Sequence, residues 1–132
     1  MKKIVEFNID SCIHESQNGW LTISNRENHI VSNLKCFKNS EEINILDVRK
    51  INLYKIHKSL FINMGKLQIL DLRDNKLMSL SKSIHFLRNL KVLRLDNNQI
   101  EYLPLEIGKL DNLETLTLNY NNIRKLPSTH GN

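Results

Sequence analysis

The residues of this chain that could carry out chemistry are its histidines, cysteines and glycines. The five histidines are scattered, and none has the spacing of the H-E-x-x-H pattern that binds zinc. Cys12 and His14 are separated by one residue, which is too little for a metal site by itself. The four glycines are isolated, so no glycine-rich loop is available to hold a phosphate group. We therefore expect no enzyme activity, no metal site and no cofactor.

Three asparagines recur inside apolar stretches, where neither a regular strand nor a regular helix favours them. Asn98 lies within LRLDNNQIEYLP, and Asn75 and Asn121 have the same place in LDLRDNKLMSLS and LTLNYNNIRKLP. An amide side chain carries both donors and an acceptor, so an inward asparagine can satisfy backbone groups that a turning chain leaves inside an apolar interior. We expect Asn75, Asn98 and Asn121 to form a structural asparagine ladder, not a catalytic site.

These stretches recur at a constant interval along the sequence, so this part of the chain consists of repeats. Each repeat must contain the structural elements that position its asparagine. An earlier, worn copy runs from Ile43 to Leu60; it has one extra residue before Leu67, and Ile51 stands in place of the asparagine. The x-Leu-x-Leu-x alternation predicts short strands that stack in parallel and bury the leucines in one interior. The columns in register are Leu67, Leu90 and Leu113; Leu70, Leu93 and Leu116; Leu72, Leu95 and Leu118; Leu77, Ile100 and Ile123; and Leu80, Leu103 and Leu126.

The pattern L-x-x-L-x-L-x-x-N-x-[LI]-x-x-L-P-x-x-I-x-x-L-x-N resembles the leucine-rich repeat of intracellular proteins. Residues 90–112, LKVLRLDNNQIEYLPLEIGKLDN, fit it throughout. Ser81 departs from the prolines at Pro104 and Pro127, and His130 departs from the isoleucine column. The resemblance implies an α/β solenoid, a leucine-rich repeat array with a parallel concave sheet, a convex side of short helices and turns, and an irregular N-terminal cap.

The predicted organisation is a cap over residues 1–42 and repeats over residues 43–132. The repeat boundaries follow from the constant step: 43–66, 67–89, 90–112 and an incomplete 113–132.

Two interpretations of the cap stay open. Strands in KKIVEFNID, through Val5, Phe7 and Ile9, and in GWLTISN could cover the open end of the solenoid. Alternatively, the segment is a degenerate repeat, since Trp20 lies one full repeat step before Ile43. We prefer a degenerate repeat used as a cap, with Trp20 in the core.

Composition points to one soluble, intracellular domain, which we expect to be cytoplasmic. Of its residues, 40% are hydrophobic, but no apolar run is long enough for a membrane span or a secretory signal. Cys12 and Cys36 are expected to be free thiols in a reducing compartment. The formal charge is +5, yet acidic residues lie close to most basic ones, which makes nucleic-acid binding an unfavoured interpretation.

Three function classes remain. The favoured one is a protein–protein interaction module or scaffold that binds a partner protein, of unknown identity, through the concave face. The second is the regulatory repeat segment of a larger enzyme, because similar arrays precede the catalytic parts of poly(A)-tail deadenylases and fungal adenylate cyclases. The third is nucleic-acid binding. A reading frame that continues past Asn132 would favour the second, and affinity that falls steeply with salt would favour the third.

The predicted binding surface consists of the outward residues of the strands and of the turns that follow them. Strand spacing places Asp71 beside Arg94 and Arg73 beside Asp96, either as a self-satisfied surface ladder or as the centre of a partner site. Tyr120 is the expected aromatic anchor, since interface hot spots favour tyrosine and arginine. The predicted concave-face residues are Asp47, Arg49, Asp71, Arg73, Arg94, Asp96, Thr117, Asn119 and Tyr120.

The last repeat is expected to expose an apolar edge, because the sequence stops partway through a convex segment. Either further repeats follow Asn132, which we favour, or the edge docks on something, including another copy of the chain. The residues of this edge are Leu116, Leu118, Ile123 and Leu126.

Overall fold

The computed structural model describes residues 4–5, 13–17, 19–24, 30–31, 33–35 and 39–127. The expectations made for the following residues lie outside these ranges: Phe7, Ile9, Cys12, Cys36 and His130.

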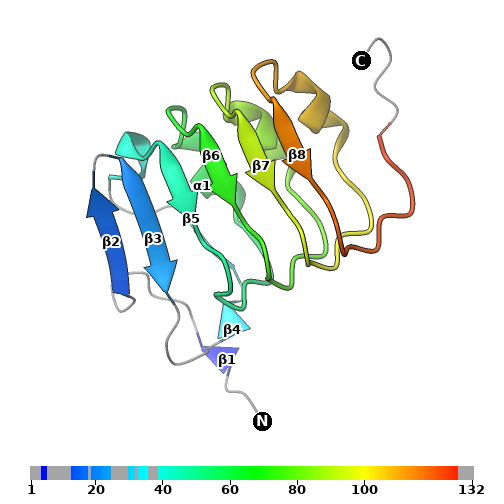
Figure 1. Ribbon diagram of the computed structural model, residues 1–132, viewed down its shortest axis with the longest axis horizontal. Helices are drawn as coiled ribbons and strands as arrows, with labels where there is room; N and C mark the ends of the chain where they lie inside the picture. The colour runs from blue at the N-terminus through cyan, green and yellow to red at the C-terminus, as the bar shows by residue number, and fades with distance from the viewer. Residues whose placement is uncertain are drawn as a thin grey trace.

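A six-stranded sheet, in the order β2-β3-β5-β6-β7-β8, forms one layer of the described structure (Figure 1). The last five of these strands are parallel neighbours, and β2 pairs antiparallel with β3 at the edge of the sheet. The parallel sheet predicted from the repeats is confirmed. The strands are β2 (Ile13–Gln17), β3 (Trp20–Ser24), β5 (Ile45–Asp47), β6 (Ile69–Asp71), β7 (Val92–Arg94) and β8 (Thr115–Thr117).

Short helices form the second layer, on the other side of the core from the sheet (Figure 1). α1 (Lys58–Ile62) packs beside η3 (Lys82–Phe86), and η3 packs beside η4 (Leu105–Lys109); η3 and η4 are 3-10 helices. Ser81 caps η3 by accepting a hydrogen bond from Ser83 N at 3.1 Å. The serine that replaces the pattern's proline is therefore a cap. A further 3-10 turn, η2 (Ser40–Glu42), precedes β5.

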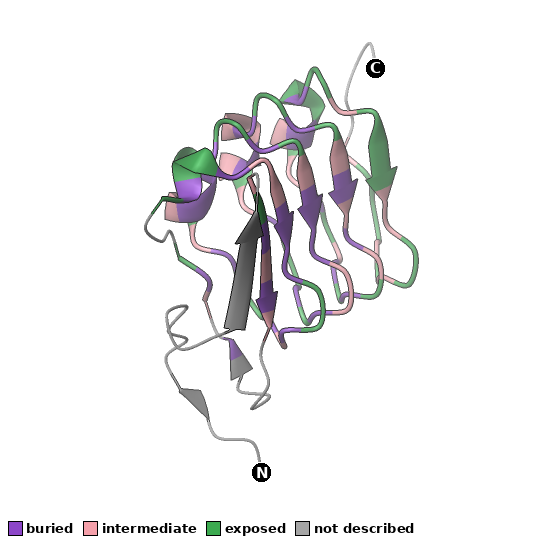
Figure 2. Ribbon diagram, turned by 60° about the vertical axis from the view of Figure 1, so that its left-hand side comes forward, coloured by how far each residue is buried: buried purple, intermediate pink, exposed green. Residues whose placement is uncertain are grey.

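The core lies between these two layers and consists of the repeating leucine columns (Figure 2). Leu46, Leu70 and Leu93 are adjacent in the sheet register and fully buried. Each such side chain stabilises the fold by roughly 1.5–3 kcal/mol through removal from water. Because every repeat adds its leucines to the same columns, the interior is continuous from β3 to β8.

The asparagines lie where the chain turns away from each strand, and each one bonds backbone groups of its own and the preceding repeat. Asn98 Oδ1 accepts a hydrogen bond from Leu77 N at 3.1 Å, and its Nδ2 donates to Leu72 O and Leu95 O, both at 3.0 Å. Asn75 Oδ1 accepts from two amides, Ile51 N at 3.1 Å and Leu53 N at 3.0 Å. These bonds satisfy backbone groups that the turn carries into the apolar interior.

The N-terminal part stacks on the first repeat at two levels. β3 pairs with β5, and the chain then forms isolated parallel bridges from Val31 to Leu53 and from Leu34 to Ile56. Val31 and Leu34 are buried, so this segment adds side chains to the same core.

The prediction that Trp20 lies in the core is wrong. Trp20 pairs with Ile45, and its side chain is 52% exposed. The repeat step aligned it with the buried Ile43, which lies before β5, but Trp20 actually pairs with Ile45. Ile45 alternates with the inward Leu46, so Trp20 faces outward. The neighbours Leu21 and Ile23 are the buried residues of β3.

The strand expected in KKIVEFNID is not a neighbour of β3. Its described part, β1 (Ile4–Val5), pairs in parallel with β4 (Ile30–Val31) in a separate two-stranded sheet. The antiparallel neighbour of β3 is β2, whose sequence IHESQ has one apolar residue and gave no alternation from which a strand could be predicted.

The last described repeat leaves apolar side chains uncovered at its outer edge. Leu116 is 36% exposed and Leu126 is 60% exposed.

We expect this chain to self-associate through that edge, because an exposed apolar patch on a terminal repeat favours association. Sedimentation velocity should show a concentration-dependent increase in sedimentation coefficient that Leu126→Lys reduces. Leu105→Lys is the matched control, since Leu105 is 63% exposed but lies on η4. A clean monomer at high concentration would contradict this expectation.

Candidate functional site

The concave face is the solvent-facing side of the strands β3 and β5 to β8, together with the turns that follow β5 to β8. Because strand pairing is in register, outward side chains form rows that cross the sheet. One row contains Trp20, Ile45, Ile69, Val92 and Thr115, and the next contains Thr22, Asp47, Asp71, Arg94 and Thr117.

Two aspartates of the second row are covered by the arginines that follow them. Asp47 is bound by Arg49 through Nε at 3.0 Å and Nη2 at 2.9 Å, and Asp71 is bound by Arg73 at 2.9 Å and 2.7 Å in the same way. The carboxylate side chains are only 12% and 10% exposed, whereas the arginines are 47% and 31% exposed. The expected outward aspartates are therefore buried, and the concave face presents guanidinium groups above them.

Hydrogen bonds in these ion pairs favour the charged forms of Asp47 and of both arginines. Burial opposes ionisation of Asp47, but the hydrogen bonds and charge of Arg49, with the nearby charge of Arg73, outweigh burial and hold the pKa of Asp47 below its ordinary value. The hydrogen bond to Asp47 raises the pKa of Arg49, and the hydrogen bond to Asp71 raises the pKa of Arg73. The arginines are thus fixed cations over buried acceptors.

The third repeat reverses the order of these charges, with Arg94 on the strand and Asp96 after it. Asp96 accepts hydrogen bonds from Thr117 Oγ1 at 2.6 Å and from Asn119 N at 2.8 Å. Burial opposes its ionisation, but these hydrogen bonds outweigh burial and hold the pKa of Asp96 below its ordinary value. The carboxylate of Asp96 is therefore directed to the next repeat.

Arg94 has no carboxylate partner among the residues that the structure describes. It is in register with Asp71, as predicted, but Asp71 is bound by Arg73 and lies 3.6 Å from Arg49 Nε. Within the described part of the chain, the Arg94 side chain forms no hydrogen bond or ion pair. A ladder that pairs Asp71 with Arg94, one of the two alternatives left open, does not form, because the arginine of its own repeat binds the Asp71 carboxylate.

Tyr120 is the most exposed large apolar side chain of the described residues, at 85%. It occupies the fourth of four equivalent turn positions that all have left-handed backbone, with φ of 53° at Lys50, 59° at Asp74, 56° at Asn97 and 59° at Tyr120. Asparagine and aspartate tolerate this conformation, whereas an aromatic residue there is strained. Strain in an exposed aromatic residue is typical of sites that have a function.

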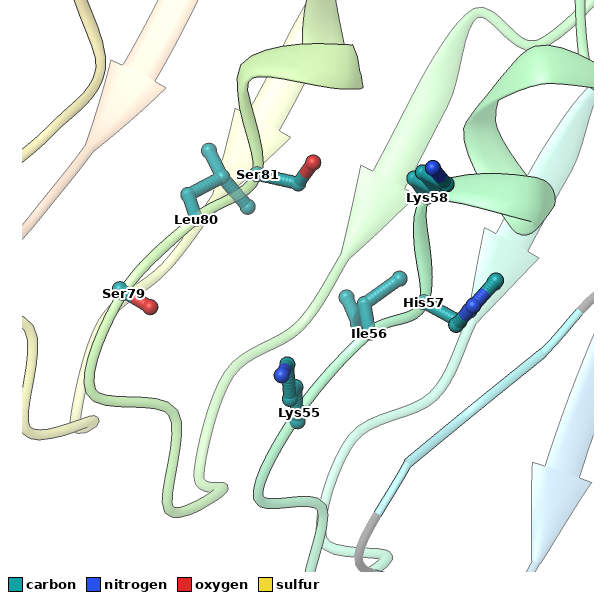
Figure 3. Close-up of a pocket in the computed structure, with 7 residues that line it drawn as sticks. All are labelled: Lys55, Ile56, His57, Lys58, Ser79, Leu80 and Ser81. Atoms are coloured by element: carbon teal, nitrogen blue, oxygen red, sulfur yellow. The ribbon is translucent and has the colours of Figure 1, made fainter.

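A hollow of about 340 Å³ lies elsewhere, between the segments that lead into α1 and η3 (Figure 3). Lys55 and Lys58 stand on one wall and Ser79 and Ser81 on the other, and the ring of His57 points away from the serines. The hollow brings none of the predicted site residues together. The concave face, which does so, is therefore the candidate site.

The described ranges hold no group of three histidine, cysteine, aspartate or glutamate side chains that could bind a metal ion. None of their helices has the length and apolar character needed to cross a membrane.

Comparison with known proteins agrees with the repeat architecture. A family model described as leucine rich repeat matches residues 41–100, and a second, described as two copies of the repeat, matches residues 88–130. The chain belongs to the leucine-rich repeat family. Domains of this family generally bind other proteins.

Solved structures are also similar to this chain, among them that of a leucine-rich repeat protein from Leptospira interrogans. That protein and this chain are 30% identical with a TM-score of 0.56, over 71% of this chain and 31% of the other. This leucine-rich repeat chain thus spans about a third of the length of that protein. No curated protein matches the chain.

The position of Trp20 in the site was missed by the sequence analysis. The signal that could have found it is the spacing of Leu21 and Ile23, which matches the spacing of the buried Leu46 and Val48. Aligning these pairs places Trp20 beside Ile45 in the outward row.

Proposed function

We propose that this leucine-rich repeat protein is an interaction module that binds a partner protein through its concave face. The observation that carries the proposal is the outward apolar row of β3 to β7, which lies directly beside the arginines that cover Asp47 and Asp71. Aromatic residues and arginine are enriched in the centres of protein interfaces. The proposal gives the chain no catalytic step.

Crosslinking at defined positions tests the proposal. A photoreactive residue at Ile69, which is half-buried on the concave face, should capture a partner from the native cell, and the same residue at exposed Lys109 on η4 should not. With that partner in hand, Ile69→Gln and Arg94→Ala should each weaken binding about tenfold, which is about 1.4 kcal/mol and more than most interface truncations cost. Lys82→Ala and Lys109→Ala should leave the affinity unchanged.

A substitution of Arg73 is unsuitable for this binding experiment. Its removal would leave the Asp71 carboxylate, 10% exposed, without its main partner, so a loss of binding could reflect a loss of stability. Loss of binding in the Lys82 and Lys109 variants, with binding retained in the Ile69 and Arg94 variants, would place the site on the convex side and contradict the proposal.

Tyr120→Gly separates binding from stability at the edge of the face. Glycine adopts a φ of 59° without strain, so the variant should be more stable by about 1 kcal/mol, because the exposed ring makes few contacts to lose. If Tyr120 anchors the partner, the same variant should bind more weakly. Thermal denaturation and affinity measured on one preparation check both. A more stable variant with unchanged affinity would remove Tyr120 from the proposed site.

A further inference from the structure

The concave face has a pattern that restricts which partner can dock there, provided that the proposed function is right. Its apolar row is formed by Trp20, Ile45, Ile69 and Val92, which are exposed or half-buried. Neighbouring parallel strands are about 4.8 Å apart, so these side chains repeat at that interval along a line that crosses the strands. An amphipathic helix repeats its apolar side chains about every 5.4 Å. Over three intervals the two patterns differ by about 2 Å, which side-chain rotamers can absorb.

An extended peptide fits this row less well. Its side chains on one face recur about every 6.8 Å, so it would fall out of step with the strands after its second side chain. The spacing therefore favours a helix that lies across β3, β5, β6 and β7.

The charged side chains beside the apolar row determine which residues are favoured on the flank of a docked helix. Arg94 lies two positions along β7 from Val92, a displacement of about 6.6 Å, which is close to the distance from a helix axis to its flanking side chains. Arg94 has no carboxylate partner among the described residues, and Arg49 and Arg73 face outward over buried aspartates. A cation without a partner on a half-buried surface gains most from a carboxylate supplied by another molecule.

We propose that the concave face binds an amphipathic helix of a partner protein whose apolar stripe rests on the Trp20–Val92 row and whose acidic flank supplies a carboxylate to Arg94. Such a helix matches both the spacing of the row and the charge beside it. Arg49 and Arg73 contribute to the positive side of the groove, but their first partners are Asp47 and Asp71.

The chain carries its own probe for this proposal, because Trp20 is its single tryptophan. Two synthetic helical peptides with the same leucine stripe are compared, one flanked by glutamate and the other by glutamine. Binding of either peptide on the apolar row should move the Trp20 emission to shorter wavelength. The glutamate peptide should bind about tenfold more tightly than the glutamine peptide, the usual difference for a charge-assisted hydrogen bond.

Arg94→Gln should abolish the difference between the peptides and leave the affinity for the glutamine peptide unchanged. Arg88→Gln, which changes an exposed arginine outside the concave rows, is the matched control and should preserve the difference.

Equal affinity for both peptides would overturn the acidic-helix proposal while leaving docking on the concave face intact. No change in Trp20 emission with either peptide would also overturn it. In that case, the crosslinking experiment at Ile69 still decides the proposed function separately.

Discussion

Replacing Asn75 by leucine should destabilise this protein by about 4 kcal/mol, more than any surface substitution. Leucine preserves the size of the side chain but removes the oxygen that accepts hydrogen bonds from the Ile51 and Leu53 amides. It also leaves the Val48 and Leu72 carbonyls without the donor that reaches them at 2.9 Å and 3.0 Å. Each buried polar group that loses its partner costs about 1–3 kcal/mol, and some of these groups will find water.

The three ladder positions should differ in a fixed order. Asn75 is 3% exposed and Asn98 is 7% exposed, whereas Asn121 is only partly buried at the open edge. The loss of stability in urea denaturation should therefore be largest for Asn75→Leu, slightly smaller for Asn98→Leu and smallest for Asn121→Leu. Lys109→Leu on exposed η4 is the control and should change stability by less than about 0.5 kcal/mol. Equal midpoints for Asn98→Leu and Lys109→Leu would refute the role of the ladder.

The repeat region could be predicted from sequence because its information is redundant. Leu70, Leu93 and Leu116 occupy one column, and further columns repeat the same step, so an error at one residue does not move the rest. Their alternation fixes which side of each strand is buried, and the register of Asp71 with Arg94 follows from the step. The sheet, the core and the side of the sheet that carries the candidate site were all accessible in this way.

The N-terminal part could not be predicted because its repeat step is broken. Trp20 pairs with Ile45, the first residue of β5, whereas the constant repeat step places it level with Ile43, a buried residue that precedes the strand. β2 is held by its pairing with β3 at the edge of the sheet, and that pairing does not depend on an apolar alternation within β2 itself. Local patterns carry little information about such a strand.

The burial of Asp47 and Asp71 could not be predicted from the sequence for a different reason. Sequence alternation correctly places Asp47 and Asp71 on the outward side of the sheet, but it does not say whether another side chain covers them. Arg49 and Arg73 bind the aspartates that precede them and cover their carboxylates. In the third repeat the arginine comes before the aspartate, and Arg94 has no such partner among the described residues. Which arginine is available to a partner therefore depends on side-chain conformation, and only the structure gives it.

Gly19→Ala should destabilise the protein by about 2–3 kcal/mol through the hairpin that joins β2 to β3. Gly19 has φ of 82°, which costs an alanine about 1–2 kcal/mol, and an added Cβ would collide with the side-chain oxygen of Asn44. To escape the collision, Asn44 must give up its hydrogen bond to Lys66 O, at a cost of about 1 kcal/mol. Thermal or urea denaturation measures the total.

Two further variants separate these causes. Gly65→Ala is the matched control, since its φ is ordinary and no atom lies within 4 Å of the added Cβ; it should be neutral or slightly stabilising. In an Asn44→Ala background, Gly19→Ala should cost only the backbone strain, and an unchanged cost there would exclude the collision. The carbonyl of Gly19 also accepts from Asn44 N at 2.7 Å and Ile45 N at 3.0 Å, which anchors the hairpin to β5 immediately before Trp20. Because Trp20 is the first residue of the apolar row, Gly19→Ala should shift its emission and weaken the binding of the helical peptides, whereas Gly65→Ala should do neither.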